Sequence, residues 1–368
     1  MQIVLTGGGT GGHIFPNIAV IDELQKSHSS HSAKNIKIAY VGENASLEKR
    51  VCESRGIEFY GISAGKLRRY FDFENFVDAF KVPVGFVQAY LALKKIKPNL
   101  VFSKGGYVSV PVVLAARILK IPVWLHESDL SPGLSNKICG RYAKKIWLSF
   151  EESKSFFPGK KVEVVGNPIR SEMLNGSREK GFKLTGFNKD KPVILVIGGS
   201  IGAQSLNKIV FASLPELLKR TQVVHITGQL ASHTESAKFA HEFEAKKNYV
   251  HFDFLEGDLA HIYAMTDLIV SRAGSGSIFE SLACEKPLIL VPLPSYASRG
   301  DQKENAAIFT QKGFAITLEQ ENLSPKMFAQ SVLNLLGSEE LRAGMIKNQK
   351  NAKYKDAAKK IAKAIAEF

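Results

Sequence analysis

The sequence predicts two doubly wound α/β domains, and three observations support that prediction. Glycine-rich loops occur four times, each between a β-like apolar run and a helix-like segment, and two lie in each half. Short β-branched runs alternate with helical stretches, which favours parallel sheets with right-handed crossovers. The 368 residues are enough for two domains that each bury a core. We therefore expect two α/β domains that face one another across a nucleotide-binding cleft.

Each half contributes its own strands and helices. Apolar, β-branched runs predict buried parallel strands, and the stretches between them have helical patterns. In the first half we expect strands at 3–6, 36–41, 100–103, 123–126 and 145–148, with helices at 17–26, 47–55, 87–96 and 111–119. In the second half we expect strands at 193–197, 223–227, 250–252, 268–271 and 288–291.

The domain joint is expected at 159–168, which is rich in Gly, Pro and Lys. The prediction is an N-terminal domain over residues 1–163 and a C-terminal domain over 164–343. The tail, about 344–368, is rich in Ala and Lys and helical by propensity. We expect this last helix to pack back on the first domain.

The composition indicates a soluble globular protein with an anionic partner. Hydrophobic residues make up 45% and charged residues 23%, which excludes a disordered chain. The formal net charge of +14 favours nucleic acid, anionic lipid or a phosphorylated ligand. The three cysteines lie far apart in no metal-binding pattern, so reduced thiols are expected. Neither a signal peptide nor a membrane-spanning stretch is recognisable, so we expect a cytoplasmic protein that can bind a membrane surface.

The first glycine-rich loop follows the first strand. Residues 7–12 match the dinucleotide-binding fingerprint Gly-x-Gly-x-x-Gly in form, and Glu43 is a candidate for binding a ribose. The additional glycines expose backbone around Thr10, and His13 brings an imidazole that can accept a proton. The structural alternative is that His13 only caps or packs the first helix.

Polar side chains follow a second buried strand, in His126-Glu127-Ser128-Asp129. Ligands bind at the carboxyl ends of strands in doubly wound sheets, so this group suggests proton transfer or recognition of sugar hydroxyls. The alternative is a loop held by local side-chain turns.

Small residues and carboxylates in the second half suit a sugar nucleotide. Ser200 ends a Gly-Gly-Ser loop that can hold a phosphate. Ser275-Gly276-Ser277 exposes N–H groups for a diphosphate, and Glu280 can accept hydrogen bonds from ribose hydroxyls. Gln302 and Asn305 offer amides for sugar hydroxyls. The structural alternatives are a dipole partner at Glu280 and a helix N-cap at Asp301.

Missing motifs narrow the chemistry. The chain has no Gly-x-x-x-x-Gly-Lys-Ser/Thr loop, no His-Glu-x-x-His or paired-Cys motif, and no Asp-x-Asp for a metal-bound diphosphate. A leaving diphosphate would then be stabilised by backbone N–H groups and a cation such as Arg170.

A basic and aromatic segment runs from Lys66 to Phe86. It is too short to span a bilayer, and we expect it to bind an anionic membrane surface, with part of it in the core. The same mixture can bind nucleic acid, but no recognised nucleic-acid module surrounds it.

Together the motifs resemble the MurG family, the N-acetylglucosaminyltransferases that convert lipid I to lipid II. The resemblance covers about the whole chain, through residues 8–13, 105–111, 126–127, 166–170, 198–203 and 272–280. It implies a GT-B fold, inverting transfer from UDP-N-acetylglucosamine without a metal or other cofactor, and peripheral attachment to the cytoplasmic face of the membrane. Cell-wall synthesis proteins are possible partners.

The resemblance also implies roles for particular residues. His13 is the candidate base, with Glu127 second, and the C4 hydroxyl of N-acetylmuramic acid attacks the anomeric carbon of the donor. The backbone at Leu255 contacts uracil, and Glu280 holds the ribose. The expected donor contacts are Thr10, Gly11, Gly12, Asp129, Arg170, Ser200, Leu255, Ser275, Gly276, Ser277, Glu280, Gln302 and Asn305. Some members have Asn at the position of Asp129 and a Gln pair at 301–302.

Other functions compete with this one. Another GT-B enzyme with a different donor or acceptor is the first, and a non-catalytic sugar-nucleotide sensor is another. An NAD-dependent enzyme is supported only by the fingerprint at 7–12, and the chain lacks a Tyr-x-x-x-Lys pair at the expected spacing.

Overall fold

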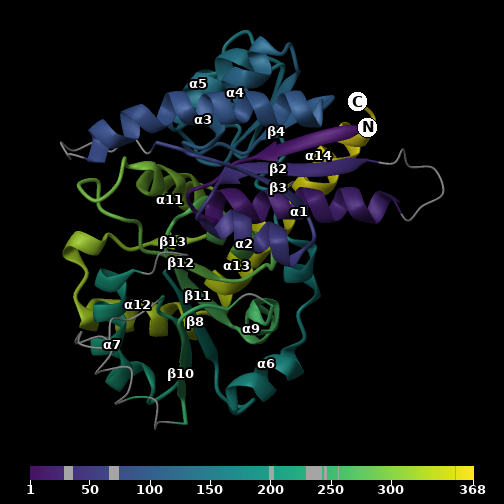
Figure 1. Ribbon diagram of the computed structural model, residues 1–368. Helices are drawn as coiled ribbons and strands as arrows, with labels where there is room; N and C mark the ends of the chain where they lie inside the picture. Colours follow the sequence, from purple (N-terminus) through teal and green to yellow (C-terminus); the bar gives the residue numbers. More distant parts are fainter. Residues whose placement is uncertain are drawn as a thin grey trace. The chain divides into compact units, whose positions relative to one another are not determined.

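The computed structural model divides the chain into two compact units (Figure 1). Unit 1 contains Met1–Arg170 and Lys353–Phe368, and unit 2 contains Ser171–Ala352. The structure describes all residues except 29–35, 66–73, 199–202, 229–242, 244–246, 256 and 353, and for 27, 28 and 74–81 it describes the backbone only. The chain thus leaves unit 1 once and returns to it at the end.

Unit 1 is built on a seven-stranded parallel sheet. Its strands are β1 (Gln2–Thr6), β2 (Lys37–Glu43), β3 (Glu58–Ile62), β4 (Leu100–Ser103), β5 (Val123–Glu127), β6 (Lys145–Leu148) and β7 (Val162–Val164). Their order is β3-β2-β1-β4-β5-β6-β7, so the direction of winding reverses between β1 and β4. Such a reversal is where doubly wound sheets bind ligands, beyond the carboxyl ends of the strands.

Helices cover both faces of this sheet because side chains alternate along each strand. Ile3 and Leu5 of β1 enter one core and Val4 enters the other. On the first face lie α1 (Gly11–His28), α2 (Leu47–Ser54) and α14 (Ala357–Ala366). On the second face, side by side in Figure 1, lie α3 (Glu74–Ile96), α4 (Ser109–Ile118) and α5 (Leu134–Tyr142). A short 3-10 helix, η1 (Glu152–Phe156), follows β6.

The tail forms two helices. α13 (Glu339–Asn351) belongs to unit 2, where the buried Gln349 amide donates to the carbonyls of Lys286 and Phe314, both at 2.9 Å. α14 belongs to unit 1 and packs against α1, with Ile361 and Ile365 fully buried. The last helix therefore completes the core of unit 1.

Unit 2 repeats the architecture with a six-stranded parallel sheet of order β10-β9-β8-β11-β12-β13. Its strands are β8 (Val193–Ile197), β9 (Gln222–Ile226), β10 (Tyr249–Phe252), β11 (Leu268–Ser271), β12 (Leu288–Leu290) and β13 (Ile316–Thr317). Its other helices are η2 (Ser171–Asn175), α6 (Arg178–Thr185), α7 (Gln204–Leu217), α9 (Leu259–Met265), α10 (Ser275–Ala283), α11 (Asp301–Gln311), η3 (Gln320–Asn322) and α12 (Pro325–Gly337). Here the winding reverses between β8 and β11.

Every strand expected from the sequence is present, and the structure adds β3, β7 and β13. β3 and β7 are the edges of their sheet and β13 is an edge of the other. Their residues are largely half-buried or exposed, so they lack the continuous apolar run of a central strand. α3 begins at Glu74 and continues through Pro83, whereas the expected helix began at residue 87.

Candidate active site

Two glycine-rich loops meet at the reversal in unit 1. The loop after β1 and the loop after β4 approach so closely that a Cβ on Gly106 would lie 2.3 Å from the carbonyl oxygen of Gly8. Gly106 also has a φ of +81°, which only glycine adopts without strain. The sequence therefore needs glycine here for packing between loops as well as for ligand access.

A buried polar network supports the first loop from below. The Tyr40 hydroxyl donates to the carbonyl of Gly7, and the Asn17 amide donates to Tyr40 at 3.0 Å and to the Thr6 carbonyl at 3.2 Å. Tyr40 and Asn17 are both fully buried. These two side chains fix where β1 ends and where α1 begins.

Thr10 and His13 lie at the N-terminus of α1, which starts at Gly11. The Thr10 hydroxyl and His13 Nδ1 are 3.0 Å apart, and the His13 N–H donates to the Thr10 carbonyl. Thr10, Gly12 and His13 are half-buried, whereas Gly11 is buried. A Cβ on Gly12 would make only an ordinary contact, at 3.6 Å from the Thr10 hydroxyl. The imidazole is thus held at a helix end that favours negative charge.

The carboxyl end of β5 carries a buried carboxylate. Glu127 is 3% exposed and accepts hydrogen bonds from the Asp129 N–H at 2.9 Å and from the Asn136 amide at 2.8 Å. Burial, with the Asp129 carboxylate nearby, raises the pKa of Glu127 to about 7. Glu127 can therefore exchange a proton near neutral pH.

His126 has a structural role, unlike the adjacent Glu127. It is fully buried, and its Nε2–H donates to the Gly166 carbonyl at 2.9 Å. Burial and the nearby Lys104 charge lower the pKa of His126 well below its usual value. His126 is therefore a neutral core residue that connects β5 to the end of unit 1.

The sequence did not single out Lys104, which the structure places in this group. Lys104 follows β4 directly, is fully buried, and donates a hydrogen bond from Nζ to the Ser128 hydroxyl. Burial lowers the pKa of Lys104 to about 8, and the Glu127 and Asp129 carboxylates oppose that shift. Its local sequence, a lysine between a buried strand and two glycines, does not distinguish a buried ammonium from an exposed one.

Arg170 is the last residue of unit 1 before the chain enters unit 2. It is 3% exposed, and its guanidinium lies over the Phe15 ring, 4.7 Å from the centroid. Phe15 belongs to the first turns of α1, so the Arg170 guanidinium lies against the same helix that carries His13.

The reversal in unit 2 brings α10 to the end of β11. α10 begins at Ser275 after Gly274, and a Cβ on Gly274 or Gly276 would meet nothing within 4 Å. Gly276, Ser277 and Glu280 are half-buried. The first turn of α10 is therefore open to a ligand, as a diphosphate site requires.

Arg272 holds the loops around α10 together. Its guanidinium donates to the Val291 carbonyl and the Ser205 hydroxyl, each at 2.9 Å, and to the Gln320 side chain at 2.6 Å. It is 3% exposed, and burial lowers its pKa to about 10. Arg272 therefore holds these loops in position.

The two amides expected to bind sugar hydroxyls make internal contacts. The Gln302 side-chain oxygen accepts from the Leu293 N–H at 3.0 Å, and the fully buried Asn305 donates to the Ala273 carbonyl at 3.1 Å. Leu255 is half-buried beyond the carboxyl end of β10. Ser200 lies outside the residues that the structure describes.

The expected residues thus fall into two groups. Unit 1 carries Thr10, Gly11, Gly12, His13, Glu127, Asp129 and Arg170, and unit 2 carries Leu255, Ser275, Gly276, Ser277, Glu280, Gln302 and Asn305. Most of them lie in loops beyond the carboxyl ends of strands or in the helices that follow.

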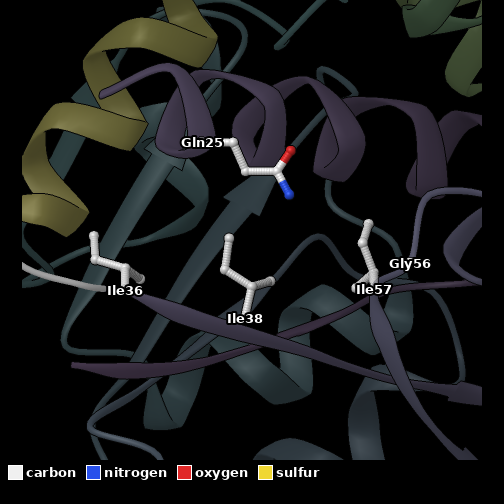
Figure 2. A pocket seen from close by; sticks show the side chains of 5 residues that line it. All are labelled: Gln25, Ile36, Ile38, Gly56 and Ile57. Atoms are coloured by element: carbon white, nitrogen blue, oxygen red, sulfur yellow. The ribbon is translucent and has the colours of Figure 1, made fainter. Parts of the chain in front are cut away.

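A separate pocket of about 250 Å³ lies in unit 1 at the amino ends of the strands, away from the carboxyl ends that carry the candidate site. It is lined by Gln25, Ile36, Ile38, Gly56 and Ile57. Figure 2 shows the Gln25 amide of α1 above isoleucines at the amino ends of β2 and β3. Doubly wound sheets bind ligands at their carboxyl edge, so this apolar pocket is not part of the candidate site.

Two family models match the chain, one in each half. The model described as the glycosyltransferase family 28 N-terminal domain matches residues 3–148, and that of the family 28 C-terminal domain matches residues 193–361. With two Rossmann-like parallel sheets, these matches define a glycosyltransferase of the GT-B fold.

Similar proteins narrow the family. A Bacillus cereus protein named UDP-N-acetylglucosamine--N-acetylmuramyl-(pentapeptide) pyrophosphoryl-undecaprenol N-acetylglucosamine transferase 2 is 45% identical over 98% of this chain and 95% of its own length. The Clostridium tetani transferase of that name, without the numeral, is 41% identical over 100% of this chain and 98% of its own. The crystal structure of Acinetobacter baumannii MurG has a TM-score of 0.74 at 27% identity, covering 100% of this chain and 99% of that one. The chain therefore belongs to the MurG group of glycosyltransferase family 28.

Proposed function

We propose that this protein transfers N-acetylglucosamine from UDP-N-acetylglucosamine to the C4 hydroxyl of N-acetylmuramic acid in undecaprenyl-pyrophosphoryl-N-acetylmuramyl-pentapeptide, lipid I. The product is lipid II, a precursor of peptidoglycan. The observation that carries this proposal is the identity of 41–45% over nearly the whole chain with transferases of that name.

Unit 2 is assigned to the donor. The open first turn of α10, at Ser275–Ser277, supplies N–H groups and a helix dipole for the diphosphate, and Glu280 accepts hydrogen bonds from the ribose. The backbone at Leu255 binds uracil, and Ser200 with Arg170 contributes to the diphosphate site. Asn305 is fully buried on Ala273, so its part is to hold the loop before α10 in place.

Unit 1 is assigned to the acceptor and to proton transfer. The C4 hydroxyl attacks the anomeric carbon from the face opposite UDP, which inverts that centre and gives a β(1→4) bond. His13 accepts the hydroxyl proton, and negative charge passes to the leaving UDP. For Nε2 to act as the base, Nδ1 must carry the proton and donate it to the Thr10 hydroxyl. Glu127 is the second candidate for the base.

Exposed apolar residues and cations on three helices of unit 1, α3, α4 and α5, support the proposal that the protein attaches to a membrane surface. Val84, Val87 and Leu91, spaced along one side of α3, are 50–59% exposed, and Ile118 of α4 and Leu134 of α5 are each 60% exposed. Exposed cations lie on the same helices at Lys94, Lys95, Arg117 and Lys137. Apolar side chains flanked by cations suit an anionic bilayer. Among the described residues no helix is long and apolar enough to cross a membrane.

This surface includes only part of the segment from Lys66 to Phe86. Residues 66–73 and the side chains of 74–81 lie outside the described structure. The proposed location is the cytoplasmic face of the membrane, where both the nucleotide donor and the lipid-linked acceptor are accessible.

The first test is acceptor-dependent release of UDP. Purified protein is given UDP-N-acetylglucosamine with and without a lipid I analogue, in the presence and absence of EDTA. The proposal predicts release that needs the acceptor and survives chelation. Intact donor binding without release would contradict it, and so would release that needs no acceptor.

A further inference from the structure

A buried lysine lies between the two loops that unit 1 is proposed to use. Lys104 is the first residue after β4, and its N–H donates to the Thr6 carbonyl at 2.9 Å, at the end of the neighbouring β1. A Cβ on Gly7 would lie 2.9 Å from the Lys104 Cβ, so the stem of this lysine packs directly against the first glycine-rich loop. The ammonium reaches the end of β5 on the other side, where it contacts Ser128.

A fully buried ammonium is costly unless opposite charges compensate it. The carboxylates that act on Lys104 are Glu127 and Asp129, both from the end of β5. Other neighbours among the described residues carry no charge: His126 is neutral, α5 contributes the Asn136 amide, and the loop after β1 contributes backbone. The Lys104 ammonium therefore lies in the electrostatic field of two carboxylates, Glu127 and Asp129.

We infer that Lys104 is a positioning residue for the transfer reaction, holding the loop of Ser128 and Asp129 in place and keeping the Glu127 carboxylate ionised. This inference rests on the proposed function, since it assigns Lys104 to the acceptor side of that site and takes the ionised form of Glu127 as the one that the reaction uses, either as the base or beside His13. Two hydrogen bonds, from the Asp129 N–H and the Asn136 amide, favour the charged form of the Glu127 carboxylate despite its burial, and the nearby charge of the Lys104 ammonium favours it too. Lys104 supplies the only full positive charge among these three.

The consequence for pH has a definite sign. Glu127 has a pKa of about 7, raised by burial and by the Asp129 carboxylate, and lowered by the hydrogen bonds from the Asp129 N–H and Asn136 and by the charge of Lys104. Removing the ammonium leaves two carboxylates to repel each other, so the pKa of Glu127 rises further. Lys104 itself loses its charge above a pKa of about 8. The kcat values of the wild-type enzyme and of a variant without the ammonium should therefore converge as the pH rises.

The test compares Lys104→Met, which keeps the stem without charge, with Lys104→Gln, which also keeps a donor for Ser128. We expect both to move the acidic limb of the kcat profile to higher pH, because the positive charge that favours ionised Glu127 is lost. For a shift of one unit from a pKa of about 7, the ionised fraction of Glu127, and with it kcat, falls about fivefold at pH 7, and the loss narrows toward pH 9. The affinity for UDP-N-acetylglucosamine should change little, and Lys26→Met, at an exposed lysine of the same unit, should leave the profile unchanged.

A merely structural lysine gives a different result. In that case either variant lowers kcat by the same factor at every pH, or leaves it unchanged, and the inference is overturned. If Lys104→Met does not fold, Lys104→Gln decides the question with the same profile. Failure of the wild-type enzyme to release UDP with the acceptor would count against the proposed function. The inference about Lys104 would then be tested by the pH dependence of the unfolding midpoint. The midpoints of the wild-type protein and Lys104→Gln should differ in the same pH range if the lysine keeps Glu127 ionised.

Discussion

At the scale of single residues, the pair of Thr10 and His13 carries the proposed proton transfer. Replacing His13 by Ala should lower kcat about 10²–10⁴-fold, the usual contribution of a general base, with little change in donor affinity. Thr10→Val removes the hydroxyl that orients the ring at nearly constant volume, and Thr10→Ser keeps it. We therefore expect a clear loss in the Val variant and near-normal turnover in the Ser variant.

Steady-state kinetics with a lipid I analogue, combined with donor binding by calorimetry, measures both effects. Near-normal turnover in His13→Ala would restrict His13 to capping α1. Equal losses in the Val and Ser variants would mean that the Thr10 hydroxyl does not orient the ring.

The residue scale also marks the limit of prediction from sequence. His13 and Glu127 could be selected because each follows a strand with glycines or polar residues around it. Lys104 could not, because a lysine beside two glycines looks the same whether its ammonium faces solvent or the core. Its burial depends on β5 lying beside β4, which the local sequence does not contain.

At the scale of elements, a buried histidine joins three parts of unit 2. His225 of β9 donates from Nε2 to Asn207 of α7 at 3.1 Å and accepts at Nδ1 from Tyr249 of β10 at 3.2 Å. The Asn207 amide donates to the Thr227 carbonyl at 2.9 Å, so its oxygen is the atom that faces the ring. This arrangement holds the neutral imidazole.

This histidine should make stability depend on pH. Burial lowers the pKa of His225 to about 3, below an unfolded value of about 6.5. Its contribution is therefore complete above about pH 6.5 and is lost as the pH falls toward 3, by up to about 1.4 kcal/mol per pH unit. Denaturant unfolding at pH 7 and pH 5 should show that loss in the wild-type protein and a smaller one in His225→Gln. Equal losses in the two proteins would contradict the assignment.

Edge strands were the elements that the sequence did not reveal. β8 and β11 consist entirely of buried residues, so their apolar runs stand out. β3 reads Glu-Phe-Tyr-Gly-Ile with only its last residue buried, which resembles a loop as much as a strand. Pro83 had a similar effect on α3, because an internal proline usually marks a helix boundary.

At the scale of the whole molecule, the formal charge of +14 favours an anionic partner, and the proposed membrane surface exposes apolar side chains of α3. Val87→Ser with Leu91→Ser removes two aliphatic side chains that are each more than half exposed. We expect binding to anionic vesicles to fall about tenfold or more, since burying such a side chain contributes about 1.5–3 kcal/mol when complete. Turnover with a soluble acceptor analogue should be preserved.

Unit 2 provides a matched control for that experiment. Leu174→Ser with Leu184→Ser removes two leucines that are 48% and 41% exposed outside the proposed surface. In sedimentation with phosphatidylglycerol vesicles, this variant should pellet with the vesicles to the same extent as the wild-type protein. Equal loss in the two double variants would show only general surface hydrophobicity, and no loss in either would remove α3 from the membrane contact.

The division of unit 1 into two stretches of chain has a consequence for synthesis. A ribosome makes residues 1–170 first, then all of unit 2, and only then α14, which packs against α1 and shares a core with Ile14, Ile18 and Ile21. Until that moment the nascent first unit exposes an apolar strip that its own earlier residues do not cover. The half of the enzyme that is translated first therefore cannot finish folding until the residues after unit 2 have been made.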